Sequence, residues 1–157
     1  MREYILAKDR QLLDRISGFH PPFLENMLES YTALGSFYLA ALFLLVSWFS
    51  GRRGFTARMV EGLAVTWAAV YALKLVFRRE RPSESHNSFV DYSFPSGHST
   101  TAFFLAVAFS HLLPALSPLF YILAALVAVS RVYLELHYPT DALTGSVIGA
   151  AAALILL

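Results

Sequence analysis

The residues best suited to chemistry lie between Ser130 and Asp141, in the stretch Ser-Arg-Val-Tyr-Leu-Glu-Leu-His-Tyr-Pro-Thr-Asp. Within it, His137 precedes Asp141 by four residues, and Pro139 lies between them. Proline favours the first position of a helix, so the Asp141 carboxylate is expected in the first turn, where it can reach back toward preceding residues. A carboxylate placed there would fix the tautomer of the His137 ring and raise the basicity of its free nitrogen, as a nucleophile requires. This stretch alone also fits a capping aspartate beside an interfacial histidine.

A second candidate stretch, Pro95-Ser96-Gly97-His98, opens an apolar segment. The start of a helix offers free N–H groups and the positive end of the helix dipole, and Gly97 allows an anion to approach the backbone closely. Ser96 could donate its hydroxyl to that anion, and His98 could protonate a leaving oxygen. An ordinary serine-rich cap with an interfacial histidine explains the same residues equally well.

Two cations precede these stretches. Lys74 and Arg81 are seven residues apart, or two helical turns, so they point the same way if their helix continues to Pro82. Two fixed cations on one stripe suit an anion such as phosphate. The alternative is snorkelling toward lipid headgroups, and we assign the neighbouring Arg78 and Arg79 to that behaviour.

The composition indicates an integral membrane protein. Apolar residues make up 57% of the 157 residues and charged residues 15%, with a mean hydropathy of +0.55. A length of this kind favours one domain. The net charge of +1 gives no indication of nucleic-acid binding, and the absence of cysteine excludes disulfides and thiolate metal sites. Residues 1–17 are charged throughout and lack the continuous apolar core of a signal peptide.

The apolar segments predict an all-α protein, a transmembrane helical bundle of about five spans. We expect the spans at residues 31–49, 59–77, 99–113, 119–134 and 142–157. An amphipathic stripe over residues 2–17 predicts an N-terminal helix, either lying in the membrane interface or packed on the loops. The expected organisation is therefore one integral-membrane domain over 1–157, with an interfacial segment at 1–30, a membrane core at 31–157 and motifs at 74–82, 95–98 and 130–141.

The last expected span has two features of its own. Gly145 and Gly149 form a small-xxx-small pair that would let another helix approach it closely. The chain ends on Leu156 and Leu157 within the apolar run, an ending compatible with truncation.

Counting the spans brings the three candidate stretches to one membrane face, and together they make one mechanism. His137 would attack phosphorus in line to form a phosphohistidine, Asp141 would stabilise the imidazolium, and His98 would protonate the departing oxygen. The groups that would hold the equatorial oxygens are Lys74, Arg81, Arg131, the Ser96 hydroxyl and the Gly97 amide. Because three cationic side chains already supply positive charge, we expect no metal and no other cofactor.

These residues resemble the type 2 phosphatidic acid phosphatase superfamily. Its three blocks occur in order: Lys74 with six residues before Arg81-Pro82, then Pro95-Ser96-Gly97-His98, then Ser130-Arg131 with five residues before His137 and three before Asp141. The resemblance implies a helical-bundle core, metal-independent hydrolysis, His137 as nucleophile, Asp141 as its orienting partner and His98 as general acid. It also implies phosphate contacts from Lys74, Arg81, Ser96, Gly97 and Arg131. Bacterial lipid phosphatases of this type usually have six spans, and here the amphipathic stretch replaces the first.

The expected substrate is a lipid phosphate or diphosphate, because a site at the membrane face of a chain with short loops would meet phosphates at headgroup depth. Candidates are polyprenyl diphosphates such as undecaprenyl diphosphate, phosphatidylglycerol phosphate and phosphatidic acid. The expected partners are this substrate and membrane lipids, with no nucleic acid, and the oligomeric state is left open. Two alternatives stay open: a vanadium haloperoxidase-like enzyme with vanadate in the phosphate position, and a lipid-binding membrane protein without turnover.

The expected location is the cell membrane, with several passes. Arg52, Arg53 and Arg58 lie between the first two expected spans, so the positive-inside rule places that loop in the cytoplasm and the candidate site on the extracytoplasmic face. The basic residues within 1–30 and at 78–79 count against this orientation.

Overall fold

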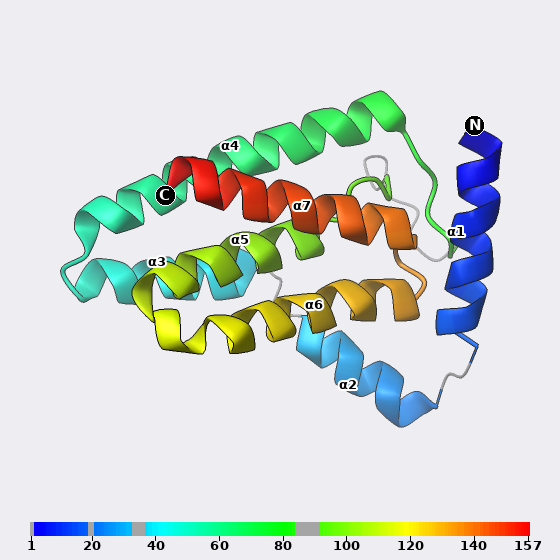
Figure 1. Ribbon diagram of the computed structural model, residues 1–157, viewed down its shortest axis with the longest axis horizontal. Helices are drawn as coiled ribbons and strands as arrows, with labels where there is room; N and C mark the ends of the chain where they lie inside the picture. The colour runs from blue at the N-terminus through cyan, green and yellow to red at the C-terminus, as the bar shows by residue number, and fades with distance from the viewer. Residues whose placement is uncertain (1, 19–20, 33–36, 84–91) are drawn as a thin grey trace.

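The computed structural model describes residues 2–18, 21–32, 37–83 and 92–157, and every regular element in these ranges is a helix (Figure 1). The elements in chain order are α1 Arg2–Ile16, α2 Pro22–Thr32, α3 Phe37–Phe49, α4 Arg53–Phe77, α5 Gly97–Leu112, the 3-10 turn η2 Pro114–Leu116, α6 Ser117–Tyr133 and α7 Pro139–Leu156. The all-α prediction is confirmed for this part of the chain.

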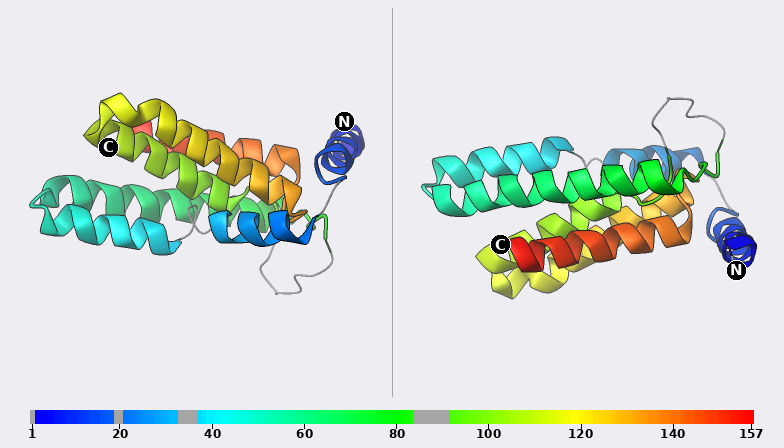
Figure 2. Two further views of the ribbon diagram at one scale, coloured as in Figure 1. Left: turned by 90° about the horizontal axis from the view of Figure 1, so that it is seen from below. Right: turned by 90° about the horizontal axis from the view of Figure 1, so that it is seen from above.

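The helices α3 to α7 lie lengthwise in one bundle, and α1 lies across one end of it (Figure 1). At this end, called here the α1 end, α4 and α6 finish and α5 and α7 begin. α3 runs beside α4, and α2 continues along the same line toward the α1 end (Figure 2). The two connections that carry the predicted motifs, from α4 to α5 and from α6 to α7, therefore meet at one end of the bundle.

The central helix α5 packs against both α6 and α7. Two glycines of α7 allow its backbone to come close: a Cβ on Gly145 would overlap the carbonyl oxygen of Ser96, and a Cβ on Gly149 would overlap that of Thr100. The prediction that this glycine pair admits another helix is confirmed, and the helix is α5. The contact of backbone with backbone fixes the start of α7 beside the start of α5.

Apolar side chains fill the centre of the bundle and also cover its outside. Met59 of α4 and Phe104 of α5 are fully buried and share a core with Ala153 of α7. Large apolar side chains such as Val76, Leu126 and Val147 are exposed instead, as expected for surfaces that face lipid rather than water. Among the described residues, three helices are long and apolar enough to cross a membrane: Arg53–Phe77, Pro114–Tyr133 and Pro139–Leu156.

The expected span boundaries need two corrections. The span expected at 59–77 begins earlier, since α4 starts at Arg53, and its 25 residues extend over about 38 Å at about 1.5 Å per residue. Its helix does not continue to Pro82, because Arg78 takes left-handed angles, φ 45° and ψ 43°, that end it at Phe77.

The remaining expectations were tested in part. Within the span expected at 31–49, α2 ends at Thr32 and α3 begins at Phe37, while residues 33–36 lie outside the described residues. Residues 84–91 of the loop before α5 lie outside them too. The expected N-terminal helix is present as α1, and its placement in a membrane interface stays a prediction.

Candidate active site

His137 lies in the connection between α6 and α7 and is 2% exposed. Its Nδ1 is 2.7 Å from the backbone oxygen of Ser93. A carbonyl oxygen only accepts hydrogen bonds, so we assign the ring proton to Nδ1 and the lone pair to Nε2. Nε2 is 3.3 Å from Nη1 of Arg81. The nitrogen that can attack therefore faces a guanidinium, the group best suited to bind a phosphate.

Asp141 is fully buried at the start of α7, as its position after Pro139 predicts. Its Oδ2 accepts a hydrogen bond from the backbone N–H of Tyr138 at 2.9 Å and lies 3.8 Å from Nδ1 of His137. A separation of 3.8 Å is too long for a hydrogen bond. Asp141 thus acts on the His137 ring through its charge, and the hydrogen bond that orients the ring goes to Ser93.

Arg81 reaches His137 by a route that differs from the expected helical stripe. Because α4 ends at Phe77, Arg81 lies on a segment that turns back over the α6–α7 connection, where Ser83 N–H donates to Glu135 O at 3.2 Å. Arg81 Nη1 also donates to the backbone oxygen of Leu136 at 2.7 Å. Arg81 is therefore held beside Nε2 of His137 by the same connection that carries this histidine.

Lys74 lies in the last turn of α4, and its Nζ donates to the backbone oxygen of Tyr92. Tyr92 adjoins Ser93, the residue whose carbonyl meets His137. Lys74 and His137 are thus hydrogen-bonded to the carbonyl oxygens of two consecutive residues, Tyr92 and Ser93, in the short segment before α5. The structure places both beside the start of that helix.

Ser96 and Gly97 form the start of α5. Ser96 is the N-cap: its Oγ accepts from Ser99 N–H at 3.4 Å and from Ser99 Oγ at 3.0 Å, and its own N–H donates to Asp141 O at 3.0 Å. The position that a Cβ would take on Gly97 lies 2.8 Å from the ring of Trp67 in α4. The missing side chain of Gly97 therefore makes room for Trp67, which the sequence interpretation had not considered.

His98 lies in the first turn of α5 and is partly exposed. Four groups lie within electrostatic reach of its ring: Arg131, His137, Arg81 and Lys74. They come from α6, the α6–α7 connection, the segment after α4 and α4 itself. The charged side chains that the sequence singled out in separate stretches thus lie around one imidazole.

Burial lowers the pKa of His137 to about 4. Arg81 and Arg131 act in the same direction, whereas Asp141 opposes them and favours the charged ring. A histidine with this pKa is neutral at pH 7 and keeps the lone pair that nucleophilic attack requires.

Arg79 is the residue that the sequence interpretation misassigned. Its side chain is 13% exposed and is held by two carboxylates: Nη1 is 2.7 Å from Asp141 Oδ1, and Nη2 is 2.6 Å from Asp9 Oδ2. The snorkelling assignment was wrong because the left-handed turn at Arg78 directs the next residue over the start of α7. Asp9 and Ser93 were missed as well, and no sequence signal marks them, since one is an ordinary acid on an amphipathic helix and the other contributes its backbone.

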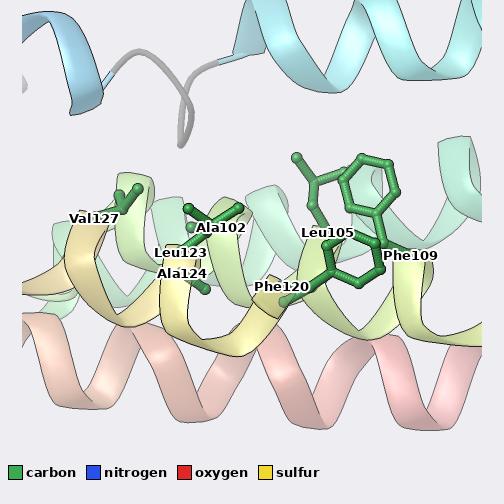
Figure 3. A pocket seen from close by; sticks show the side chains of 8 residues that line it. Ala102, Leu105, Phe109, Phe120, Leu123, Ala124 and Val127 are labelled. Carbon is green, nitrogen blue, oxygen red and sulfur yellow. The ribbon is translucent and has the colours of Figure 1, made fainter. Parts of the chain in front are cut away.

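An apolar pocket lies between α5 and α6, at a different place from these residues (Figure 3). It encloses about 70 Å³ and is lined by Ala102, Leu105, Ala106, Phe109, Phe120, Leu123, Ala124 and Val127. This volume is smaller than the cavity of about 150 Å³ that holds a benzene molecule. It offers no polar group to a phosphate, so the histidine cluster is the candidate active site. Among the described residues, no group of three or more His, Asp or Glu side chains could hold a metal ion.

A buried neutral histidine that faces a guanidinium, at the end of a bundle of apolar helices, defines a membrane protein with an anion site. Residues 55–157 match the PAP2 superfamily, and the chain belongs to this superfamily. It is similar to the lipid A 4′-phosphatase of Bacteroides thetaiotaomicron, with 28% identity over 95% of this chain and 75% of the relative. It is also similar to the lipid A 1-phosphatase of Rhizobium etli, with 30% identity over 86% of this chain and 71% of the relative.

Two crystal structures show the same fold. LpxE of Aquifex aeolicus has a TM-score of 0.80 and 25% identity, covering 92% of each chain. A PAP2-type phosphatidylglycerolphosphate phosphatase of Bacillus subtilis has a TM-score of 0.82 and 25% identity, covering 98% of this chain and 84% of the other. The protein is accordingly a membrane phosphatase of the PAP2 superfamily, and the relatives that it resembles are named for their action on lipid phosphates.

Proposed function

We propose that this protein hydrolyses a lipid phosphate or diphosphate at the α1 end of the bundle, without a metal ion, through a phosphohistidine at His137. One observation carries the proposal: the hydrogen bond of Nδ1 to Ser93 O leaves the lone pair of Nε2 facing Arg81, 3.3 Å away. The nucleophile and the cation for its target are thus adjacent before substrate arrives.

In the first step, Arg81 turns its donors from Nε2 to the oxygens of the incoming phosphate. Nε2 then attacks phosphorus in line, so that a P–N bond forms as the P–O bond to the lipid breaks. His98 donates a proton to the departing alkoxide or phosphate. The equatorial oxygens are stabilised by the turned Arg81 side chain and by four further donors: Lys74, Arg131, Ser96 and the Gly97 N–H.

In the second step, water attacks the phosphohistidine and gives its proton to His98. The P–N bond breaks, inorganic phosphate leaves, and the His137 ring becomes neutral again. Asp141 supports both steps, because its carboxylate lies 3.8 Å from Nδ1 and stabilises the positive charge that the ring carries while bonded to phosphorus. The three cationic side chains supply the charge compensation that a metal ion provides in other phosphoryl-transfer sites.

The proposed substrates share a phosphate at headgroup depth. Candidates are undecaprenyl diphosphate, phosphatidylglycerol phosphate and phosphatidic acid. Lipid A joins them because two of the relatives above are named for its dephosphorylation. Undecaprenyl diphosphate is supported by one further relative. A putative undecaprenyl-diphosphatase of Escherichia coli, YbjG, is 33% identical over 72% of this chain and 62% of the relative.

Phosphate release from these four lipids by the purified protein in detergent, with and without a chelator, tests the proposal. We expect release from at least one lipid, unchanged by the chelator. Replacing His137 with Ala should lower the rate by more than about 10³-fold, and radiolabelled phosphate on the wild-type protein should be labile to acid and stable to alkali. Full activity of the His137→Ala variant would remove this residue as nucleophile.

The proposed membrane arrangement is one domain with five spans and an interfacial α1. α4 and α6 are both apolar enough to cross and both end at the α1 end. The chain must therefore return to the opposite end between Phe77 and Pro114, and α5 makes this return. The helices α4, α5 and α6, together with α7 and the line formed by α2 and α3, make the five proposed spans.

The proposed orientation in the cell membrane places the α1 end on the extracytoplasmic side. The turn between α3 and α4, with Arg52 and Arg53, lies at the opposite end of the bundle and is expected in the cytoplasm. The chain has no cysteine, so single-cysteine variants at the exposed positions Arg52 and Arg78 can be compared directly. A membrane-impermeant maleimide applied to intact cells should label Arg78→Cys and spare Arg52→Cys, and the reverse result would invert the orientation.

A further inference from the structure

The guanidinium of Arg79 joins two helices that are distant in sequence. Nη1 donates to Asp141 Oδ1 and to Thr140 Oγ1, both at 2.7 Å, at the start of α7. Nη2 donates to Asp9 Oδ2 at 2.6 Å, on α1. Its charge also lies over the ring of Tyr138, 4.0 Å from the centroid. A side chain with this many partners is held in one position.

Arg79 is in contact with both groups that face Nδ1 of His137. Its side chain holds Oδ1 of Asp141, which leaves Oδ2 on the side of the ring, 3.8 Å from Nδ1. Its backbone oxygen accepts the Ser93 N–H at 2.8 Å, and the Ser93 carbonyl meets Nδ1 at 2.7 Å. The position of Arg79 therefore influences both the charge and the hydrogen bond that act on His137.

Asp9 completes the contact from α1. Its side chain is 3% exposed, and it accepts from Arg79 and from the Thr140 N–H and hydroxyl. One cation thus lies between two buried carboxylates. Because Asp9 shares the Arg79 charge, the charge of Asp141 is only partly neutralised and remains available to the ring of His137.

We propose that Arg79 and Asp9 are positioning residues for the phosphatase reaction, through which α1 sets the orientation and the effective charge of Asp141 beside His137. The proposal rests on the proposed roles of His137 and Asp141. It assigns to the N-terminal helix a direct part in the site, in addition to the membrane contact predicted for it.

The sign of the coupling follows from the groups around the His137 ring. These are Arg81 and Arg131, which disfavour a charged His137, and Asp141, which favours it. The ring of His98 also lies within electrostatic reach of His137. Removing the Arg79 charge takes away the cation that pairs with the Asp141 carboxylate, so the ring of His137 should protonate at a higher pH. Removing the Asp9 charge leaves Asp141, among the described residues, as the only carboxylate paired with the Arg79 guanidinium. The charge of Asp141 is then compensated more completely, so the ring of His137 should protonate at a lower pH.

The test compares pH profiles of kcat/KM in detergent for wild type, Arg79→Gln, Arg79→Lys and Asp9→Asn. Matched controls are Arg78→Gln, an exposed arginine next to Arg79, and Asp14→Asn, an exposed acid on the same helix as Asp9. We expect the acid limb of the profile to move up by about one pH unit in Arg79→Gln and down in Asp9→Asn. Arg79→Lys should keep the limb and lower kcat by about tenfold, the effect typical of a lost orienting partner.

Profiles of Arg79→Gln and Asp9→Asn that coincide with those of their controls would overturn the proposal, and so would shifts of both in the same direction. A loss of rate with an unmoved acid limb would mean a purely structural role and would overturn it too. If Arg79→Gln is not recovered folded, Asp9→Asn against Asp14→Asn decides alone. Failure of the phosphatase proposal is distinct, since then the wild type would release no phosphate from any of the four lipids, or His137→Ala would retain full activity.

Discussion

The two ends of the sequence are attached to the bundle by different kinds of contact. α7 meets α5 backbone to backbone, where Gly145 and Gly149 lie against the carbonyls of Ser96 and Thr100. α1 and α2 meet the same bundle mainly through side chains. Asp9 of α1 contacts Thr140, and Tyr31 of α2 donates its hydroxyl to Leu123 O at 3.1 Å.

This difference indicates that the α5–α7 contact is rigid, whereas the contacts of α1 and α2 with the bundle can adjust. A backbone contact without intervening side chains leaves little room for relaxation, so the α5–α7 pair holds the two motif blocks at one separation. A polar side chain can change rotamer or charge without moving a helix. We therefore expect substitutions at the α5–α7 contact to affect folding, and substitutions at the N-terminal contacts to affect tuning.

The largest expected effect is on stability and comes from Gly149→Val. The new side chain would overlap the Thr100 carbonyl, so α7 would have to move away from α5. We expect the folded protein to be destabilised by on the order of 3 kcal/mol. Thermal unfolding in detergent measures it. Ala151→Val, at an exposed position of the same helix, serves as the control. Equal unfolding temperatures of the two variants would contradict the close contact.

The next effect is on catalysis and comes from Arg81→Ala. It removes the guanidinium 3.3 Å from Nε2 of His137, and kcat/KM should fall on the order of 100-fold, about 2.7 kcal/mol of transition-state stabilisation. Steady-state phosphate release measures the change, with Arg78→Ala as the exposed neighbouring control. If both variants keep the wild-type rate, Arg81 makes no contact with the transition state.

A further effect, on both stability and activity, is expected from pH. The pKa of His137 is about 4 in the folded protein, below its ordinary value of 6.5. The unfolded chain therefore binds this proton first, so stability present above pH 6.5 is lost as the pH falls from 6.5 toward 4. The acid limb of kcat/KM should lie near the lower value, where the nucleophile becomes charged.

Unfolding in denaturant at several pH values measures how the free energy of unfolding depends on pH, and the His137→Gln variant should show a weaker dependence. A wild-type acid limb near pH 6.5 would show that burial leaves the histidine unperturbed.

The smallest effect is expected from Tyr31→Phe. It removes one hydrogen bond between α2 and α6, at a cost of about 1 kcal/mol, and leaves the site untouched. Unfolding temperature and phosphate release, measured on the same preparation, should show a small fall and no change. A large loss of activity would mean that the position of α2 bears on catalysis.

Part of this picture could be predicted from the residues alone. The helical class followed from long apolar runs, and the close approach of a helix to α7 followed from the spacing of Gly145 and Gly149, since only small residues permit it. The end of α4 was not predictable in the same way. Nothing in the residues 78–82 except Pro82 stops a helix, and the left-handed turn at Arg78 comes four residues earlier.

The candidate site shows the same division. His137, Asp141 and Arg81 carry side chains whose chemistry is visible in sequence. The acceptor of the His137 hydrogen bond is a backbone carbonyl, which every residue has, so no residue type marks Ser93. Arg79 and Asp9, 70 positions apart, were likewise unpredictable as partners, because each is an ordinary charged residue, one just after the end of α4 and the other in the middle of α1.

The sequence by itself determined that the chain is helical, apolar and equipped with the histidines and cations of a phosphate chemistry, because these properties belong to residue types and their spacing. The tertiary structure decided which nitrogen of His137 holds its lone pair, which arginine faces it, and that a carboxylate from α1 lies next to the site. Such properties depend on where separate helices place their backbones and side chains, and packing fixes that arrangement only when the whole chain has folded.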